Sequence, residues 1–530
     1  MQLGSFQIRL VEATVRWVED HKLLSFSIFS FFYFLGACGK ASSKLFWFDE
    51  LFSWYVAKLP SLSDIWNALY KGVDTNPPLQ YFLIRASHWV FGTGELATRL
   101  PFIIGFWLAL FFLFLLITKR CGSLIAYLSV IFLCLSGFYA YAFEARPYAL
   151  VLACCCVSLF FWESAIEGRF RRLALLGLSL ILNIALFSHY YAIFLFIPLM
   201  MGEAYRSFRF RRVDWPIWIS IAAGAVVLIP LAPIILTVIR RSEFFWAKPT
   251  WGVFLKSIDW FFRDPALVCF YGVGCLLGVI KAVDSLTPNK KNQRIGWNVP
   301  SHEWIAVMIL MMLPIIGYVI AKLVTNAFIS RLFIPAAIGI AWGLALLYHR
   351  LLQGRLLITA LLLASLLGIF IAKQAADAQG LFPKKLNLRI AKSFTWASSI
   401  PGNTPIVISD PIVFLQYQYY APPGLKSRLC CLVNFNAVDQ NKSPRVCSIE
   451  QLREKFPIPV EDYQSFLSSH NHFYLLYISN KLLIHKLMED GVQLKVKNVG
   501  ERKGDILFEA LMDDSFSGKA RRSSMMRIIP

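Results

Sequence analysis

Long apolar runs constrain this chain more than any other feature of its sequence. They recur from the N-terminal region to about residue 374, and each, at about 17–22 residues, is long enough to cross a hydrocarbon core of roughly 30 Å as a helix. Only 16% of the residues are charged, against roughly a quarter in soluble domains. We therefore predict a membrane protein with eleven spans, at 23–40, 98–117, 121–137, 146–164, 171–187, 190–206, 215–238, 266–282, 303–323, 328–348 and 355–374.

The basic residues behind the formal net charge of +21 are distributed as the positive-inside rule expects of a membrane protein. Basic residues gather in short loops at alternate turns, which places those loops in the cytoplasm. The intervening segments, including 41–97, then face outward, and an odd number of spans sends the residues after 375 to the same side. This distribution explains the charge without a nucleic-acid partner. The basic loops contain Lys119, Arg120, Arg169, Arg171, Arg172, Arg206, Arg209, Arg211, Arg212, Lys290, Lys291, Arg294, Arg350 and Arg355.

The first outward loop, 41–97, carries signals for two short helices. Ser61 can cap a helix whose third position is Asp64, close to a capping box. A second helix is expected to begin at Asn76, with Asn76 as the cap and proline following, and to end at Gly92. Both have an apolar stripe, so we expect them to lie on the membrane surface and to enclose a membrane-embedded site.

The composition changes after residue 375. Predicted strands at 404–409, 472–478, 492–498 and 504–511, with a helix at 480–490, indicate a small α/β layer domain. A disulfide from Cys447 to Cys430 or Cys431 is compatible with an oxidising, extracytoplasmic location. The chain thus divides into a cytoplasmic segment (1–22), a transmembrane domain (23–374), an extracytoplasmic α/β domain (375–512) and a disordered tail (513–530).

Ionisable and aromatic groups at the outward ends of spans are the candidate functional residues. Such groups are costly near lipid and usually line a cavity. Their mixture of carboxylates, cations and phenols suits a site that binds an anionic group and deprotonates a neutral one. Each also has a simpler explanation, as a solvated loop pair, an interfacial anchor, a helix start or part of an aromatic belt. The set comprises Asp49, Glu50, Asn76, Glu144, Arg146, Tyr148, His189, Tyr190 and Arg331.

An ordered series of motifs resembles the polytopic GT-C glycosyltransferases. FWFDE follows the first span, and PSLSDIW, DTNPPLQYFLIR and FGTGELATRLP follow in turn. YAFEARPYAL, FSHYYAIF and SRLFIPA then match later segments, so that the resemblance covers roughly residues 20–350. It is to the branch with lipid A aminoarabinose transferases and protein O-mannosyltransferases. The C-terminal domain matches only in position.

The resemblance implies a helical bundle with its catalytic cavity at the outer face of a plasma or inner membrane. It implies inverting transfer of one sugar, a hexose or pentose, from a polyprenyl-phosphate carrier to a lipid, polysaccharide or protein acceptor. The family's first-loop acidic position falls on Asp49, with Glu50 beside it, and a second acidic position falls on Glu144. At Asn76 the chain departs from relatives that carry a charged residue before the proline, which weakens transfer of a metal or phosphate role to that position.

The residues are chemically consistent with this activity. Asp49 would act as general base on the acceptor, with Glu50 orienting it, while the carrier phosphate leaves. Cations such as Arg146 and Arg331 would offset the negative charge that develops on the phosphate, and Tyr148, His189, Tyr190 and Asn76 would bind carrier or sugar. The reaction requires no cofactor, although Glu144 and His189 are compatible with a divalent metal at the phosphate.

Two other functions use the same features. A lipid-linked saccharide flippase or transporter would need the cavity without a base, so it would tolerate loss of the Asp49 carboxylate. A membrane scaffold would need only the C-terminal domain, so changes at Asp49 and Glu144 would be silent.

Overall fold

The computed structural model groups the chain into two units, the first made of Met1–Leu45 and Phe52–Lys384 and the second of Phe46–Leu51 and Lys385–Pro530. The structure describes residues 12–241, 248–259, 267–268, 270, 272–274, 276, 299–325, 328, 334–352, 356–381, 394–433, 449, 452–478, 481–499 and 506–512.

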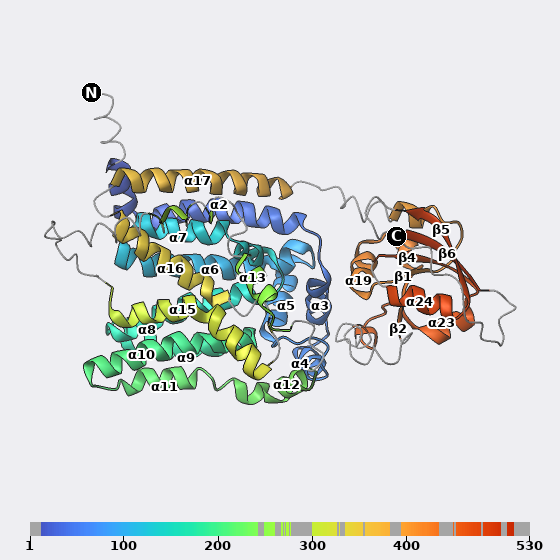
Figure 1. Ribbon diagram of the computed structural model, residues 1–530, viewed down its shortest axis with the longest axis horizontal. Helices are drawn as coiled ribbons and strands as arrows, with labels where there is room; N and C mark the ends of the chain where they lie inside the picture. The colour runs from blue at the N-terminus through green and yellow to red at the C-terminus, as the bar shows by residue number, and fades with distance from the viewer. Residues whose placement is uncertain are drawn as a thin grey trace, which may run out of the picture. The chain divides into compact units, whose positions relative to one another are not determined.

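The first unit is a bundle of helices, many of them side by side (Figure 1). Within the described residues, seven helices are long and apolar enough to cross a membrane, or up to nine if each of two bent pairs is one span. The elements are α2 (Lys22–Ser43), α3 (Phe48–Ala57), α4 (Leu62–Tyr70), α5 (Leu79–Phe91), α6 (Glu95–Cys121), α7 (Ser123–Leu135), η1 (Gly137–Phe143), α8 (Tyr148–Ile166), α9 (Arg171–Ser188), η2 (Tyr190–Leu195), α10 (Phe196–Phe210), α11 (Trp215–Ala223), α12 (Leu228–Arg241), α13 (Trp251–Asp259), α15 (Ser301–Ile320), η4 (Ala321–Thr325), α16 (Ile334–Leu351), α17 (Leu356–Ala378) and η6 (Gln379–Leu381).

The predicted membrane protein is confirmed, and the spans differ from prediction in shape. The predicted span 121–137 is α7 followed by η1, with a bend of 75°, and 215–238 is α11 followed by α12, with a bend of 41°. The predicted span 190–206 is the 3-10 turn η2 followed by the 15-residue helix α10. Most of 266–282 lies outside the described residues.

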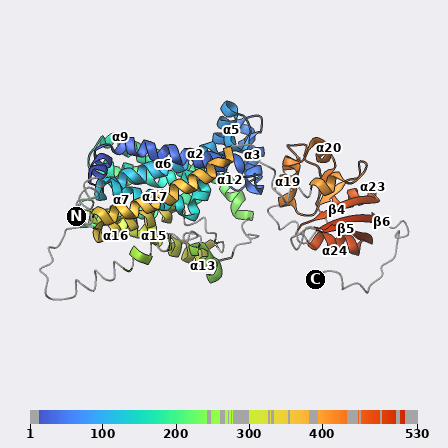
Figure 2. The ribbon, with the colours of Figure 1, turned by 90° about the horizontal axis from the view of Figure 1, so that it is seen from above.

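Helices α2 and α17 pack with their backbones in close contact, and both views show them side by side (Figures 1 and 2). Gly36 and Gly39 of α2 make this approach possible. A Cβ on Gly39 would lie only 2.6 Å from the Cα of Ala378, and one on Gly36 would lie 2.8 Å from the Cα of Gln374. Small residues at helix contacts are a common basis of association in membranes, because they let the backbones approach.

The loop after α2 forms the two predicted helices. The capping box of α4 is present, since the Ser61 hydroxyl accepts from the Asp64 N–H and the Asp64 carboxylate accepts from the Ser61 N–H. Helix α5 ends at Gly92, at φ 80°, as expected. Its start was predicted wrongly, because α5 begins at Leu79 after Pro78. The Asn76 side chain donates to Asp74 instead of capping the helix, at 3.3 Å between Nδ2 and Oδ1.

The second unit contains a six-stranded mixed sheet with the order β3-β2-β1-β4-β6-β5. Strands β1, β2, β3 and β4 are parallel to their neighbours in this group, while β6 is antiparallel to β4 and β5. The elements are β1 (Ile406–Ile408), α19 (Pro411–Tyr420), α20 (Pro423–Lys426), β2 (Leu429–Val433), β3 (Val460–Asp462), α23 (Tyr463–Ser469), β4 (His472–Tyr477), α24 (Lys481–Glu489), β5 (Val492–Val499) and β6 (Ile506–Met512).

Helices α23 and α24 share one apolar core with the sheet. Phe466 of α23 and Leu487 of α24 are buried with Val407, Leu432 and Leu475 of the strands. The α/β class was predicted correctly, together with β1, β4, α24, β5 and β6. The prediction missed β2, although Cys430 and Cys431 belong to it and are buried. Cys447 lies outside the described residues, so the disulfide stays a prediction.

Candidate functional site

A buried ion pair lies where the first loop of the helical unit meets the start of α8. Arg146 Nη1 is 3.0 Å from Asp74 Oδ2, and the two side chains are only 6% and 11% exposed. Arg146 Nη1 also lies 3.4 Å from the Ser53 hydroxyl of α3. Burying two charges is expensive unless they are paired and further hydrogen-bonded, so this arrangement constrains all three segments.

Asp74 is the centre of this cluster, because its two oxygens have several donors. The Tyr81 hydroxyl donates to Oδ2 at 2.7 Å, while the Thr75 N–H and the Asn76 amide donate to Oδ1 at 2.6 Å and 3.3 Å. Burial and the neighbouring Asp74 carboxylate raise the pKa of Tyr81 well above its usual value, although Arg146 partly opposes this. Tyr81 therefore remains a hydrogen-bond donor at neutral pH and supports Asp74 as the anion.

Tyr190 is the first residue of η2, the turn between α9 and α10, and directly follows His189. The hydroxyl oxygen is buried, and it has no hydrogen-bond partner among the residues that the structure describes. Buried hydroxyls are normally satisfied, so this phenol is a candidate ligand-binding group.

The bent span positions Glu144 and Arg146. The chain leaves α7 at Ser136, runs through η1, and reaches Glu144 in an extended conformation. The Arg146 N–H then donates to the Glu144 carbonyl at 2.8 Å, and Pro147 is the N-cap of α8. The Glu144 carboxylate is 3.0 Å from Lys44 Nζ, at the end of α2. The bend between α7 and η1 therefore leads to a tight turn, with Glu144 and Arg146 just before α8.

Tyr148 and His189 are brought together by ring contacts. Their centroids are 5.7 Å apart, and the His189 ring also lies 4.8 Å from that of Tyr191. The Nδ1 atom of His189 accepts from the Tyr191 N–H at 3.1 Å, which caps η2. This contact assigns the proton of a neutral His189 imidazole to Nε2.

Asp49 and Glu50 occupy the first turn of α3, in the segment that belongs to the second unit. Glu50 is fully buried, and its Oε2 accepts from the Trp47 N–H at 3.3 Å, as the third residue of a capping box does. Asp49 is half-buried at the second helical position, where the helix dipole favours a carboxylate. The two neighbours thus differ: Glu50 has a structural contact, and Asp49 is the more accessible.

Helix α19 fixes this acidic segment from within the second unit. The Phe46 N–H donates to the Tyr420 hydroxyl at 2.8 Å, and the Gln416 amide donates to the Phe46 carbonyl at 2.6 Å. The Phe46 ring also contacts that of Tyr419, with centroids 5.5 Å apart. The main chain immediately before Asp49 is therefore held by a helix of the sheet domain.

The structure groups the predicted residues unevenly. Arg146 and Asn76 contact Asp74, and Tyr148 contacts His189, whereas Glu144 pairs with Lys44. Arg331 lies outside the described residues. The sequence reasoning missed Asp74, although an acidic residue just before Asn76-Pro77 in an outward loop was a usable signal.

The metal that Glu144 and His189 were predicted to bind stays a prediction. No three His, Cys, Asp or Glu side chains cluster in the part of the chain that the structure describes. Glu144 is paired with Lys44, and His189 Nδ1 accepts a main-chain hydrogen bond. We therefore derive no step through a metal.

Comparison with known proteins finds that part of this chain is similar to one family. Residues 75–236, which include Arg146 and Tyr190, match the family model described as dolichyl-phosphate-mannose-protein mannosyltransferase. This match covers less than half of the chain. No curated protein matches the sequence significantly.

The fold is similar to that of solved structures of ArnT from Cupriavidus metallidurans. The apo structure aligns with a TM-score of 0.56 and 11% identity, covering 94% of this chain and 98% of that one. The structure bound to undecaprenyl phosphate aligns with a TM-score of 0.53 and 14% identity, covering 96% and 100%. The similarity extends over both units and shows that the chain has the ArnT-like fold.

Proposed function

We propose that this protein transfers a single hexose or pentose from a polyprenyl-phosphate carrier to an acceptor at the outer face of the cell membrane, with inversion. The observation that carries the proposal is the buried Arg146, which pairs with Asp74 just before α8. Arg146 lies inside the segment that matches the mannosyltransferase family. The undecaprenyl phosphate bound by ArnT, which has the same fold, supports a carrier of this class. The acceptor is a lipid, a polysaccharide or a protein.

Asp49 is the proposed general base. It accepts the proton of an acceptor hydroxyl or amine while the acceptor atom forms a bond to the anomeric carbon. The bond from that carbon to the phosphate oxygen breaks, and the carrier phosphate leaves with the electron pair. Attack on the face opposite the leaving group inverts the anomeric configuration. Asp49 suits this role better than Glu50, because it is the more accessible of the two.

Arg146 is proposed to stabilise the phosphate. The leaving group gains negative charge in the transition state, and a guanidinium in a dry site stabilises that charge without first having to reorient. Asp74 acts as a positioning residue, because it fixes the guanidinium at 3.0 Å and is itself fixed by Tyr81. The buried Tyr190 hydroxyl is available to donate to the carrier phosphate or the sugar.

The proposal is tested by replacing Asp49 with Asn and measuring sugar transfer. Cells that produce wild type, Asp49→Asn or no protein are compared by mass spectrometry of membrane glycolipids and glycoproteins. Purified wild type and variant are then assayed with the donor so identified. Loss of general-base catalysis predicts a rate that falls by about 10²–10⁴-fold, with the melting temperature unchanged.

Glu454→Gln is the matched control, because it removes an exposed carboxylate of the second unit. It should leave transfer unchanged. Transfer by Asp49→Asn at the wild-type rate would show that the base is another residue. A protein that moves labelled lipid-linked sugar across vesicles, and never transfers it, would be a transporter.

A further inference from the structure

The short sequence Arg-Phe-Arg-Arg occurs twice in the helical unit, at residues 169–172 and 209–212. The first copy joins α8 to α9, and the second joins α10 to α11. Helices α9, α10 and α11 lie together in the bundle (Figure 1), so the two copies are at the same end of it. The proposed transfer reaction uses neither copy.

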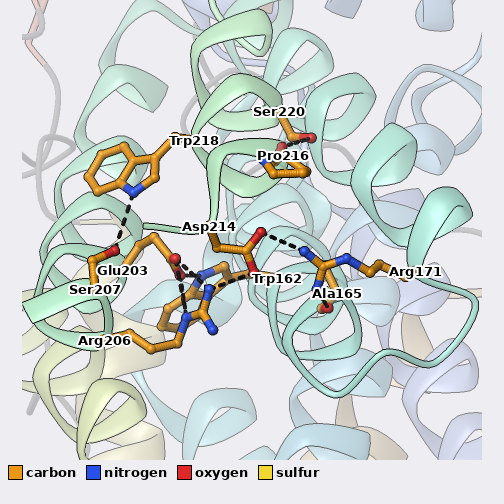
Figure 3. Close-up of polar contacts among 10 residues, drawn as sticks. All are labelled: Trp162, Ala165, Arg171, Glu203, Arg206, Ser207, Asp214, Pro216, Trp218 and Ser220. Carbon is orange, nitrogen blue, oxygen red and sulfur yellow. Dashed lines mark hydrogen bonds and ion pairs between the residues drawn. The ribbon is translucent and has the colours of Figure 1, made fainter. Parts of the chain in front are cut away.

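Asp214 ties the two copies together, as Figure 3 shows. One carboxylate oxygen is 2.5 Å from Arg171 Nη2, and the other is 2.8 Å from Arg206 Nη2. Arg171 also donates to the Ala165 carbonyl at the end of α8, at 2.8 Å. One carboxylate therefore fixes the α8–α9 loop beside the α10–α11 loop.

Glu203 completes this inner network. It is fully buried, it accepts two hydrogen bonds from the Arg206 Nε and Nη2 groups at 2.9 Å and 2.6 Å, and it accepts one from the Trp162 indole at 3.2 Å. The carboxylates of Asp214 and Glu203 are thus occupied by two inner arginines, Arg171 and Arg206, and that of Glu167, just before the first loop, pairs with Lys119 and Arg120. They are not available to the arginines that face outward.

Five outer arginines remain exposed on the two loops. None of them makes an ion pair with a carboxylate in the part of the chain that the structure describes. The first turn of α9 has two arginines and no acidic residue. A helix N-terminus already favours an anion, so this end has an excess of positive charge that an external anion would balance. The outer arginines are Arg169, Arg172, Arg209, Arg211 and Arg212.

Aromatic side chains are exposed among these arginines. Phe170, Phe208 and Phe210 are 80%, 82% and 68% exposed, and Trp215 at the start of α11 is 66% exposed. Phe170 and Arg211, at φ 43° and 50°, adopt left-handed backbone conformations that L-residues rarely occupy. The chain therefore turns sharply at both copies. Aromatic rings beside cations are typical of the membrane–water interface.

An apolar stripe continues from the arginines along the bundle. Leu173, Leu176 and Leu180 of α9 are 62–69% exposed and recur at helical spacing, and Ile219 of α11 is 63% exposed. Such an apolar stripe suits contact with lipid acyl chains, while the arginines at its end suit pairing with headgroup phosphates. No soluble anion would use both features.

We propose that the twin loops form a binding surface for anionic phospholipids of the leaflet at this end of the bundle. The phosphates bind the outer arginines, the rings of Phe170, Phe208, Phe210 and Trp215 lie at headgroup depth, and the acyl chains lie along α9 and α11. Asp214 and Glu203 pair with Arg171 and Arg206. These pairs hold the two loops together and leave the charge of the outer arginines unchanged.

The surface is tested by native mass spectrometry of the purified full chain in detergent. The protein is titrated with phosphatidylglycerol and with phosphatidylcholine of the same acyl chains. Wild type should retain phosphatidylglycerol preferentially. A variant with Arg169, Arg172, Arg209 and Arg212 replaced by Gln should lose this preference by at least about tenfold, because each cation near an anionic surface contributes roughly fivefold to binding. Its melting temperature should be unchanged, since all four side chains are exposed.

The matched control replaces four exposed cations of the second unit, Lys426, Arg453, Lys455 and Lys495, by Gln. It changes the net charge equally and should keep the preference. Equal binding of the two lipids by wild type, or equal loss in the control, would overturn the proposal. So would displacement of the lipid by inorganic phosphate at constant ionic strength, or tighter binding of an RNA oligonucleotide than of phosphatidylglycerol.

Discussion

At the scale of single residues, the most consequential contact is the one between Asp74 and Arg146. Breaking a buried pair leaves an uncompensated charge, which costs about 3–5 kcal/mol. We expect Asp74→Asn to lower the free energy of unfolding by that amount, measured by denaturant titration in detergent. The double variant Asp74→Asn/Arg146→Gln should recover much of the loss, because both charges are gone. A double variant as unstable as the sum of both single variants would contradict this pairing.

Two tyrosines of the candidate site are predicted to differ in what their hydroxyls do. Tyr81→Phe removes a 2.7 Å hydrogen bond to a carboxylate and should cost about 1.5–3 kcal/mol. Tyr190→Phe removes a hydroxyl without a partner among the described residues, so stability should stay the same while KM for the lipid-linked donor rises. Thermal unfolding and steady-state kinetics separate the two effects. If Tyr190→Phe were destabilised and its KM for the donor unchanged, Tyr190 would not be a donor-binding residue.

His88 gives stability a defined pH dependence. Its pKa is lowered to about 4 from an ordinary value of 6.5, because burial and then the charge of Lys58 disfavour the imidazolium. The neutral His88 ring therefore contributes its full stabilisation above about pH 6.5, and this contribution is lost as the pH falls toward 4. We expect the melting temperature of wild type to fall over this interval more steeply than that of His88→Asn. Parallel curves would show that His88 is not responsible.

At the scale of elements, the packing of α2 on α17 depends on Gly39. A Cβ there would overlap the backbone of α17, and overpacking of this kind costs about 1–3 kcal/mol. We expect Gly39→Ala to lower the melting temperature of the detergent-solubilised protein. Gly368→Ala is the matched control, because it lies on α17 with open space around its Cα. Equal stability of the two variants would mean that the helices can separate without cost.

The elements also show what a sequence can and cannot predict. Apolar length predicted the seven long spans among the described residues, and Ser61 with Asp64 predicted the start of α4, because both signals are local. The start of α5 was wrong because Asn76 is bound by Asp74, which in turn is fixed by Tyr81 and Arg146 from other elements. Strand β2 was missed because LCCLV is short and apolar throughout, with no alternation to distinguish it. The sequence offered Asp74 as an acidic residue of an outward loop, but its partners Tyr81 and Arg146 could not be predicted, since they meet it only in the fold.

At the scale of the whole molecule, the orientation in the membrane is a prediction of the basic loops. Reporter fusions at residue 400 should report an outward location, and fusions at residue 170 a cytoplasmic one, because the positive-inside rule separates them. A cytoplasmic signal at residue 400 would contradict both the odd number of spans and the proposed outer-face reaction.

The bent span formed by α7 and η1 has a consequence for how the chain is made. Helix α7 has only 13 residues, about 20 Å of helix, which is too short to cross the hydrocarbon core. All of its residues are buried, and its neighbours include α16 and α17. The Tyr139 hydroxyl, just after α7, donates to Gln374 of α17 at 2.7 Å. Gln374 is synthesised more than two hundred residues after Tyr139. During synthesis, α7 therefore lacks its contacts with α17, and the contacts that bury α7 are completed only after α17 has been made.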